Sequence, residues 1–309
     1  MLLILSLFIG KQMPAKTDHT QKDVISPQPN SLRPGLYLVP TPIGNLRDLT
    51  FRALDVLSSV DLVVCEDTRV TGKLMKAFGF KKPMRVYNDH ATERDRKNII
   101  NVIAEGESVA LVSDAGTPLI SDPGYKLVRE IIQLGHPVTA LPGANAVLPA
   151  LQLSALPCDS FSFIGFLPAR TGARKAILEK WIDLPGTLIA YETGPRLAES
   201  LRDIKTVLGD RPVAIARELT KLYEEVRRGR VSELYEAIKG EAAPKGEIVL
   251  VIGENKQAEV GASMDTIEGQ LREALRNLSV RDAAELVAGA TGKPKKAIYT
   301  LALKLSGKG

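Results

Sequence analysis

The chain has 309 residues, of which 44% are hydrophobic and 25% charged, and its formal net charge is +5. This length suits about two domains, and a modest positive charge is compatible with a polyanionic partner without requiring one. The two cysteines, Cys65 and Cys158, give neither a disulfide framework nor a zinc-type spacing, so we expect reduced thiols and no metal site.

The N-terminal segment 1–34 is expected to be a disordered lead-in. It opens with the apolar run MLLILSLFIG, which is shorter than the roughly 20 residues needed to cross a bilayer and lacks the basic start of a signal peptide. We interpret this run as an over-extended start, with Met13 as the true initiator; secretion or anchoring is the less favoured alternative. The protein is therefore expected in the cytoplasm and not at a membrane.

From Gly35 onward, short apolar runs alternate with amphipathic stretches, which is typical of α/β folds with a mostly parallel sheet and right-handed crossovers. In the first half, strands are predicted at 36–39, 62–65, 84–87, 109–112 and 138–141. Helices are predicted at 49–58, 71–78, 92–104, 125–133 and 146–155. We expect these elements to form a first α/β domain over residues 35–156.

The alternation resumes after Leu156 and predicts a second α/β domain over residues 157–260. Its strands are expected at 161–166, 187–191, 213–216 and 247–252, and its helices at 173–181 and 195–208. Residues 264–309 are helical in character, with a turn near 290–294 and a capping-box pattern from Ser279 to Asp282. This last segment is expected to be a helical, RNA-binding extension.

The ends of the predicted strands are rich in small and polar residues: PTPIGN, EDTR, NDH, SDAGTP, LPGANA, YETGP and RELT. Any one of these could be a simple turn, but seven in succession favour a ligand cleft, because α/β proteins bind ligands beyond the carboxyl ends of their strands. The most informative stretch is LVSDAGTPLISDPG, where Asp122 suits a helix N-cap and Pro123 the first helical position. No dinucleotide fingerprint or phosphate-binding P-loop motif is present.

The combination of motifs resembles the tetrapyrrole-methylase superfamily of S-adenosyl-L-methionine-dependent methyltransferases. Within it, the chain is most similar to the branch of ribosomal RNA small subunit methyltransferases, which 2′-O-methylate a cytidine of 16S rRNA. The segments that carry the resemblance are LYLVPTPIGNLRDLT, LVSDAGTPLISDPGYKLV, LPGANAVLPALQLSALP, FIGFLPA and ARELTK. The small-molecule branch has a glycine-rich first loop; Pro-Thr-Pro-Ile-Gly stands here instead, which argues against a tetrapyrrole substrate.

The resemblance implies two α/β domains with S-adenosyl-L-methionine in the cleft between them. It further implies a homodimer whose partner is 16S rRNA, presented within the small ribosomal subunit. The residues that it places on the cofactor are Pro42, Ile43, Ser113, Asp114, Thr117, Asn145, Ala146, Glu192 and Leu219.

Methyl transfer needs alignment and exclusion of water more than a strong acid, but a ribose hydroxyl is a weak nucleophile and a base should help. Our first candidate is His90, because histidine exchanges protons near neutral pH; alternatively, it is only a polar residue before a helix. Asp67 and Asp89 are further candidates, although either could pair with Arg69 or cap a helix. Glu66 could orient the target ribose or be an ordinary solvated residue.

Basic residues that could hold RNA phosphates lie in three places, and a solvated surface charge is the alternative at each. They are Arg69, Arg227 and Arg228 of an Arg-Arg-Gly-Arg run, and Lys295 and Lys296 of the C-terminal helices. From Thr291 onward the chain has five lysines and no acidic residue, which is typical of a nucleic-acid docking module.

Two other functions stay open at this point. One is methylation of a tetrapyrrole or another small molecule on the same scaffold. The other is a non-catalytic RNA-binding factor in ribosome assembly that keeps the cleft without using it.

Overall fold

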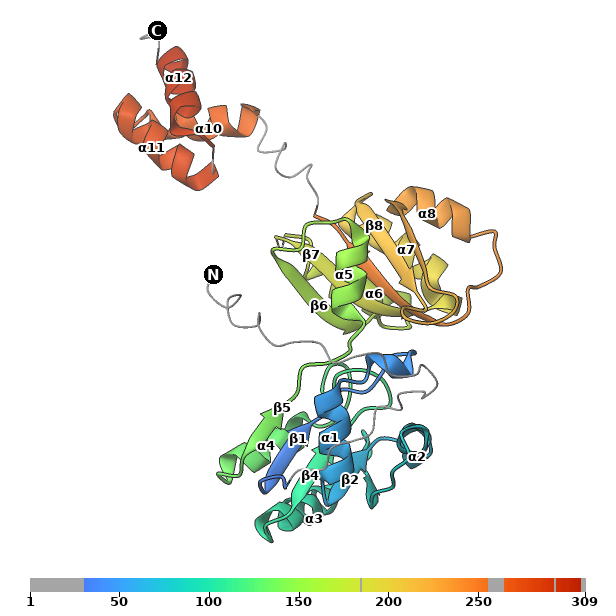
Figure 1. Cartoon of the computed structure of the whole chain (residues 1–309). Coiled ribbons are helices and arrows are strands. Elements are labelled where there is room, and N and C mark those ends of the chain that lie inside the picture. The colour runs from blue at the N-terminus through green and yellow to red at the C-terminus, as the bar shows by residue number, and fades with distance from the viewer. Residues whose placement is uncertain (1–30, 184, 255–263, 292, 307–309) are drawn as a thin grey trace, which may run out of the picture.

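The structure is a computed structural model, and it describes residues 31–183, 185–254, 264–291 and 293–306. Two five-stranded sheets and a C-terminal group of helices follow one another along the chain (Figure 1). The interpretation of the N-terminal apolar run falls outside the described residues. Within them, no helix is long and apolar enough to cross a membrane.

The first sheet is parallel throughout, as predicted, with the strand order β3-β2-β4-β1-β5. Every residue of β2 and β4 is buried, because helices cover both faces of the sheet, and this explains their continuous apolar sequences. The strands are β1 (Gly35–Leu38), β2 (Leu62–Cys65), β3 (Met84–Val86), β4 (Ser108–Leu111) and β5 (Val138–Ala140).

The helices of this half divide between the two faces of the sheet. One face packs against α1 (Phe51–Ser59) and α2 (Thr68–Ala77), which follow the short 3-10 helix η1 (Leu46–Asp48). The other face packs against α3 (Glu93–Ala104) and α4 (Tyr125–Gln133). A capping box between Thr92 and Asp95 starts α3, as the sequence predicts.

The second sheet has the order β6-β7-β10-β8-β9 and only its β6–β7 pair is parallel. The expectation of a mostly parallel sheet is therefore wrong here. The loop 218–224 joins β8 to β9 as a hairpin, and a parallel crossover needs about a dozen residues or more. The strands are β6 (Phe161–Phe166), β7 (Thr187–Thr193), β8 (Pro212–Arg217), β9 (Glu225–Arg230) and β10 (Glu247–Ile252).

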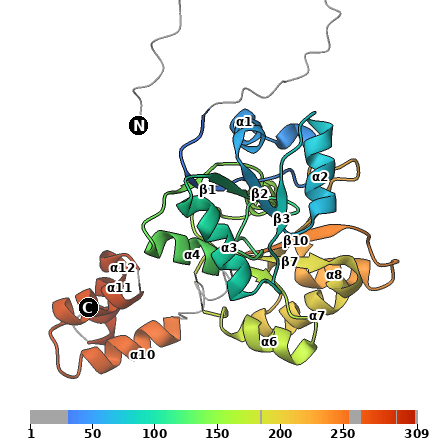
Figure 2. The same ribbon diagram turned by 90° about the horizontal axis from the view of Figure 1, so that it is seen from below.

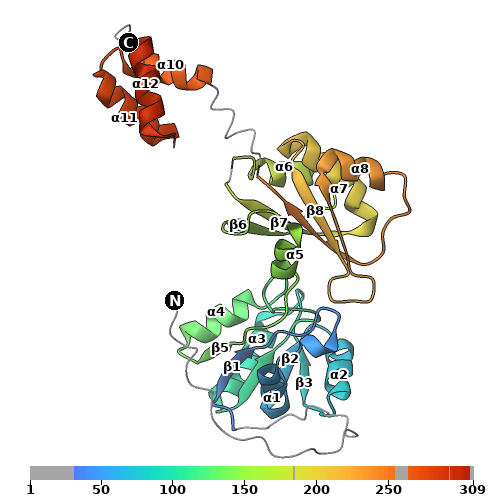
Figure 3. The ribbon, with the colours of Figure 1, turned by 45° about the horizontal axis from the view of Figure 1, so that its top comes forward.

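One face of the second sheet is covered by three helices and the other by one. The three are α6 (Thr171–Glu179), α7 (Leu197–Leu208) and α8 (Val231–Ile238), with the 3-10 helix η2 (Gly194–Arg196) before α7. On the opposite face lies α5 (Val147–Ser154), whose Val147, Ala150 and Leu151 share a buried cluster with strand residues of this sheet (Figure 3). α5 therefore packs on the second sheet, although it precedes the domain boundary that we expect at residue 156.

A buried ion pair joins α6 to α7 within this half. The side chain of Arg174 is fully buried and its Nη2 lies 2.6 Å from Oδ2 of the equally buried Asp203. Arg174 also donates to the carbonyls of Pro168 and Ala169, each at 3.2 Å. These bonds supply the partners that a buried guanidinium requires.

The C-terminal helices form a group of their own (Figure 2), and their buried side chains make a small hydrophobic core. They are α10 (Met264–Ala274), α11 (Val280–Thr291) and α12 (Lys295–Leu305). Ser279 caps α11, as the predicted capping box requires of it: its Oγ accepts from the Asp282 N–H at 3.2 Å, and its hydroxyl donates to the Asp282 carboxylate at 2.6 Å. The helical character expected from the sequence is confirmed for these residues.

Candidate functional site

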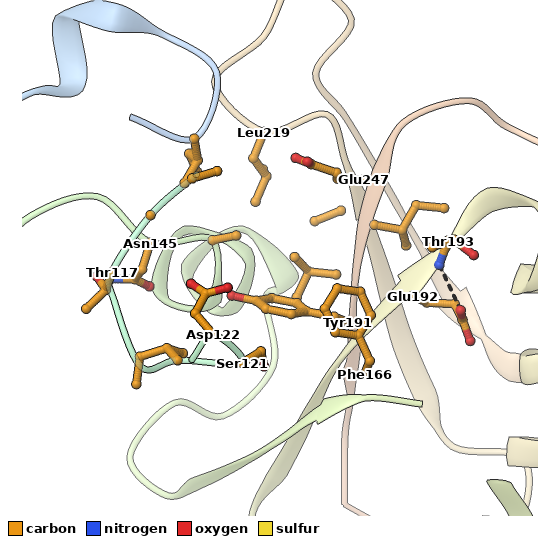
Figure 4. Close-up of a pocket in the computed structure, with 18 of the residues that line it drawn as sticks. Thr117, Ser121, Asp122, Asn145, Phe166, Tyr191, Glu192, Thr193, Leu219 and Glu247 are labelled. Atoms are coloured by element: carbon orange, nitrogen blue, oxygen red, sulfur yellow. Dashed lines mark hydrogen bonds between the residues drawn. The ribbon is translucent and has the colours of Figure 1, made fainter. Parts of the chain in front are cut away.

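A cavity of about 310 Å³ lies where the ends of the two sheets meet (Figure 4), a size typical of small-molecule sites. The first half contributes Ile43 and the loops that follow β4 and β5. The second half contributes Phe166 of β6, the end of β7, and Leu219 of the β8–β9 loop. The strand-end motifs SDAGTP, LPGANA, YETGP and RELT therefore do converge on one hollow.

The first wall of the cavity is three strand-end loops bonded together. Thr41 and Gly116 exchange two backbone hydrogen bonds of 2.9 and 3.0 Å, which fix the loop after β1 against the loop after β4. Thr117 Oγ1 donates to the Ala144 carbonyl at 3.0 Å and so joins the loop after β5. Gly116 has a φ of +88°, and a Cβ there would lie 3.2 Å from Ile43, so this contact favours glycine.

The second wall depends on the β8–β9 loop. Leu219 lies between Glu218 and Thr220, whose φ angles of +51° and +65° are left-handed. Lys221 Nζ secures the loop, because it donates to Glu218 at 2.8 Å and to Glu247 at 3.0 Å. The stem of Lys221 lies so close to Gly44 that any Cβ at Gly44 would clash with it. The hairpin of the second sheet therefore contacts the first loop of the chain directly.

Seven of the nine residues expected to contact the cofactor line the cavity: Ile43, Asp114, Thr117, Asn145, Ala146, Glu192 and Leu219. Pro42 and Ser113 are not among the lining residues. Ser113 is buried behind the wall, where its Oγ donates to the Gly116 carbonyl at 3.1 Å. These placements do not test the roles themselves, which stay predictions.

Glu192 enters the cavity wall only through its backbone. Its side chain is fully buried and lies 2.7 Å from Arg196 Nη2. It also accepts hydrogen bonds from the Ser200 hydroxyl and from the Thr193 N–H, the latter at 2.8 Å (Figure 4). The carboxylate is thus a structural link between β7 and α7, and it cannot contact a ligand in the cavity in this arrangement.

Asp122 has a different position from the one that the sequence predicts. The N-cap of α4 is Gly124, which provides no side-chain cap, so Asp122 is not a helix cap. It lines the cavity instead. Burial, followed by the nearby carboxylates of Asp114 and Asp89, raises the pKa of Asp122 to about 6, while the Ser113 hydroxyl lies within hydrogen-bonding reach and opposes part of this rise.

Glu66, at the end of β2, is a second perturbed carboxyl group. It is half-buried, and its Oε1 has no hydrogen-bond partner among the described residues. Burial, with the carboxylates of Asp122 and Asp114, raises the pKa of Glu66 to about 7. Glu66 is not one of the lining residues, but the charges of two lining residues, Asp122 and Asp114, act on it.

None of the three residues expected to act in catalysis lines the cavity. Asp67 caps α2: it accepts the Arg69 N–H at 2.7 Å and pairs with the Arg69 guanidinium at 2.6 Å, and these bonds lower the pKa of Asp67 to about 2. His90 and Asp89 are exposed on the turn after β3, where the His90 N–H donates to Asn88 Oδ1 at 3.0 Å. The capping alternative left open for Asp67 is therefore the observed one.

The residues expected to contact RNA differ in how free their charges are. Arg227 pairs with Glu225 and Glu241, and Arg228 donates to the Leu153 carbonyl, so both have partners within the fold. The exposed Arg69 pairs with Asp67. On the C-terminal helices, Lys295 lies 2.5 Å from Glu285, and Lys296 is exposed.

Within the described parts of the chain, no group of three or more His, Cys, Asp or Glu side chains is arranged to hold a metal ion. The cavity combines carboxylates with apolar surface from Ile43, Leu219 and Val249. Such a wall suits a ligand that has a flat or apolar part together with positive charge.

A family model described as tetrapyrrole (corrin/porphyrin) methylases matches residues 35–235. The chain belongs to this family. A second model, described as the RsmI C-terminal HTH domain, matches residues 262–306, which include all three C-terminal helices. The family resemblance and the α/β fold class expected from the sequence are therefore confirmed.

Two of the relatives match this chain over nearly their whole length. A protein of Mesorhizobium japonicum named ribosomal RNA small subunit methyltransferase I is 44% identical over 89% of this chain and 93% of its own. A protein of the same name from Erythrobacter litoralis is 50% identical over 89% of this chain and 96% of its own. Among solved structures, a uroporphyrin-III C-methyltransferase of Thermus thermophilus, crystallised with S-adenosylhomocysteine, has a TM-score of 0.50 at 20% identity, over 71% of this chain and 97% of its own. That likeness concerns the fold.

Proposed function

We propose that this protein methylates the ribose 2′-oxygen of a cytidine in 16S rRNA, with S-adenosyl-L-methionine as the methyl donor. The observation that carries the proposal is the shared cavity of Asp114 and Asn145, in a chain whose near-full-length relatives are named small-subunit rRNA methyltransferases. The first loop, Pro-Thr-Pro-Ile-Gly, supports RNA over a tetrapyrrole as the substrate.

The cavity wall fits the chemistry of this donor. Ile43, Leu219 and Val249 provide apolar surface for an adenine ring, and Asp114 and Asn145 provide acceptors for an ammonium group and ribose hydroxyls. S-adenosyl-L-methionine, when bound, supplies a methyl group activated by a positively charged sulfur. The protein residues would hold the two reactants in line and exclude water.

The RNA partner would bind mainly through the C-terminal helices. They carry Lys295 and Lys296 at the start of α12, where no acidic residue lies in the first turn. Arg227, Arg228 and Lys295 are less suitable than the sequence suggested, because their charges already have partners within the fold, whereas Lys296 is exposed. The same proposal includes a target presented within the small ribosomal subunit, a cytoplasmic location and a homodimer.

Mass mapping of 16S rRNA tests the proposal. Cells that lack the gene are expected to lose a methyl group from a cytidine ribose, and the wild-type gene should restore it while the Asp114→Asn gene should not. An unchanged map would refute the proposed function. A non-catalytic assembly factor would leave the map unchanged and would show no heat of binding with S-adenosyl-L-methionine in calorimetry.

A further inference from the structure

We propose that the Asp122 carboxylate accepts the proton of the target hydroxyl during methyl transfer. This inference rests on the proposed function and names the residue that the sequence could not identify. Its basis is the position of Asp122 in the cavity, the backbone that holds it there, and the absence of a competing partner for its charge.

The position of Asp122 is at the open end of the cavity. Its neighbours in the wall there, Ile120, Ser121 and Phe166, are all exposed. Other lining residues, such as Leu219 and Val249, are buried. The exposed residues beside Asp122 leave room for a nucleotide of a large RNA to approach, so we place its ribose next to Asp122.

The backbone around Asp122 is held in an uncommon conformation. Leu119 and Ser121 have φ angles of +74° and +69°, and Gly124 has +132°. For residues other than glycine such angles cost about 1–3 kcal/mol each, and they cluster at functional sites. The simpler alternative would be a relaxed Asp-Pro-Gly turn with Asp122 as the cap of α4, and this is not what the chain adopts.

The other acidic residues that line the cavity already have partners for their carboxylates. Glu192 is bonded to Arg196, and Glu247 to Lys221. Asp114 accepts the Asp67 N–H at 3.2 Å. Asp122 forms no ion pair with any lysine or arginine of the described residues, and the Ser113 hydroxyl lies within hydrogen-bonding reach of its carboxylate.

The groups around Asp122 suit a proton acceptor near neutral pH. Asp114 and Asp89 raise its pKa by charge, in addition to burial. Across the cavity the Tyr191 ring faces the same space (Figure 4), and burial with the Asp122 charge raises the Tyr191 pKa to about 12, so Tyr191 stays neutral. Glu66 adds a further acidic group behind the wall. A base is most effective when its pKa lies near the working pH.

In the proposed step the Asp122 carboxylate takes the proton as the O2′–H bond breaks. The electron pair left on O2′ forms the bond to the methyl carbon. The electron pair of the broken carbon–sulfur bond stays on the sulfur, which becomes a neutral thioether. The proton then leaves Asp122 to water. Atoms and charge balance without a further reactant.

The test compares Asp122→Asn and Asp122→Glu with Asp159→Asn, an exposed aspartate outside the cavity. Small ribosomal subunits that lack the modification serve as substrate, and calorimetry measures the affinity for S-adenosyl-L-methionine. We expect Asp122→Asn to lower saturating turnover about 100-fold or more with the donor Kd within about threefold of wild type. Asp122→Glu should retain measurable turnover, and Asp159→Asn should match wild type.

The pH profile gives a second readout on the wild-type protein. Saturating turnover should fall on the acid side with a midpoint near the Asp122 pKa of about 6, and this limb should be absent from the residual activity of Asp122→Asn. Turnover of Asp122→Asn within about threefold of wild type, or a loss confined to donor affinity, overturns the inference. A wild-type protein that methylates no small-subunit RNA refutes the proposed function itself, and the inference falls with it.

Discussion

Replacement of Glu66 by glutamine should stabilise the protein at alkaline pH and leave it unchanged at acid pH. The Glu66 pKa is raised from 4.5 to about 7, mainly by burial and then by the charges of Asp122 and Asp114. Between these two pH values the native state keeps the proton and the unfolded state has lost it. The free energy of unfolding therefore falls as the pH rises through this window.

The size of the effect follows from the same values. At about 1.4 kcal/mol per pH unit, the difference between 4.5 and about 7 sets an upper limit of about 3 kcal/mol. Because Glu66 is only half-buried, solvent screens part of this energy, and we expect about 1–2 kcal/mol. Glutamine carries no charge and keeps the shape, so the variant should gain that amount at pH 8 and almost nothing at pH 4.5.

Thermal unfolding followed by circular dichroism at both pH values measures the gain, which corresponds to about 2–4 °C per kcal/mol in domains of this size. Glu179→Gln, at an exposed position of α6, is the matched control and should show no pH-dependent difference. An equal gain at both pH values, or a loss of stability at pH 8, would refute the reasoning.

Four further outcomes are expected. Asp114→Asn should weaken S-adenosyl-L-methionine about tenfold or more in calorimetry and leave RNA affinity within about twofold, because one acceptor of the cavity is lost. Removal of residues 264–309 should weaken binding to small-subunit RNA and flatten its salt dependence; an unchanged salt slope would contradict the docking role. Asp67→Ala should move the midpoint of chemical denaturation to a lower denaturant concentration, because the cap of α2 is removed. Arg174→Met should lower the free energy of unfolding by about 3–5 kcal/mol, because Asp203 is then a buried charge without its closest partner, and a smaller loss in Arg174→Met with Asp203→Leu would confirm that cause.

The strand ends could be predicted from the sequence because their signals are local. An apolar run followed by glycine, proline, aspartate or asparagine indicates a buried strand and its turn. Five such runs predicted all five strands of the first sheet. The parallel arrangement of that sheet followed from the helices between the runs. The meeting of Asp114 and Asn145 in one cavity then follows from geometry alone, since both lie at the same edge.

The errors arose where tertiary contacts decide the structure. β9 contains three arginines and has no apolar alternation, so its identity as a strand depends on pairing with β8 along its whole length. α5 has small apolar residues whose sequence does not specify which sheet they cover, and in the structure they pack on the second sheet. Asp122 satisfies every local rule for a helix cap, yet the conformation of Leu119 and Ser121 turns it into the cavity.

The two walls of the cavity share one structural feature, although they come from different sheets. Each presents a residue to the cavity from a turn with left-handed residues other than glycine: Leu119 and Ser121 before Asp122, and Glu218 and Thr220 around Leu219. Such turns persist only where the surroundings fix them. On the second wall, the ion pairs of Lys221 do so, and Lys221 in turn contacts the first loop at Gly44. The shape of the site is therefore a joint property of both halves, and neither sheet would present these residues in the same way without the other.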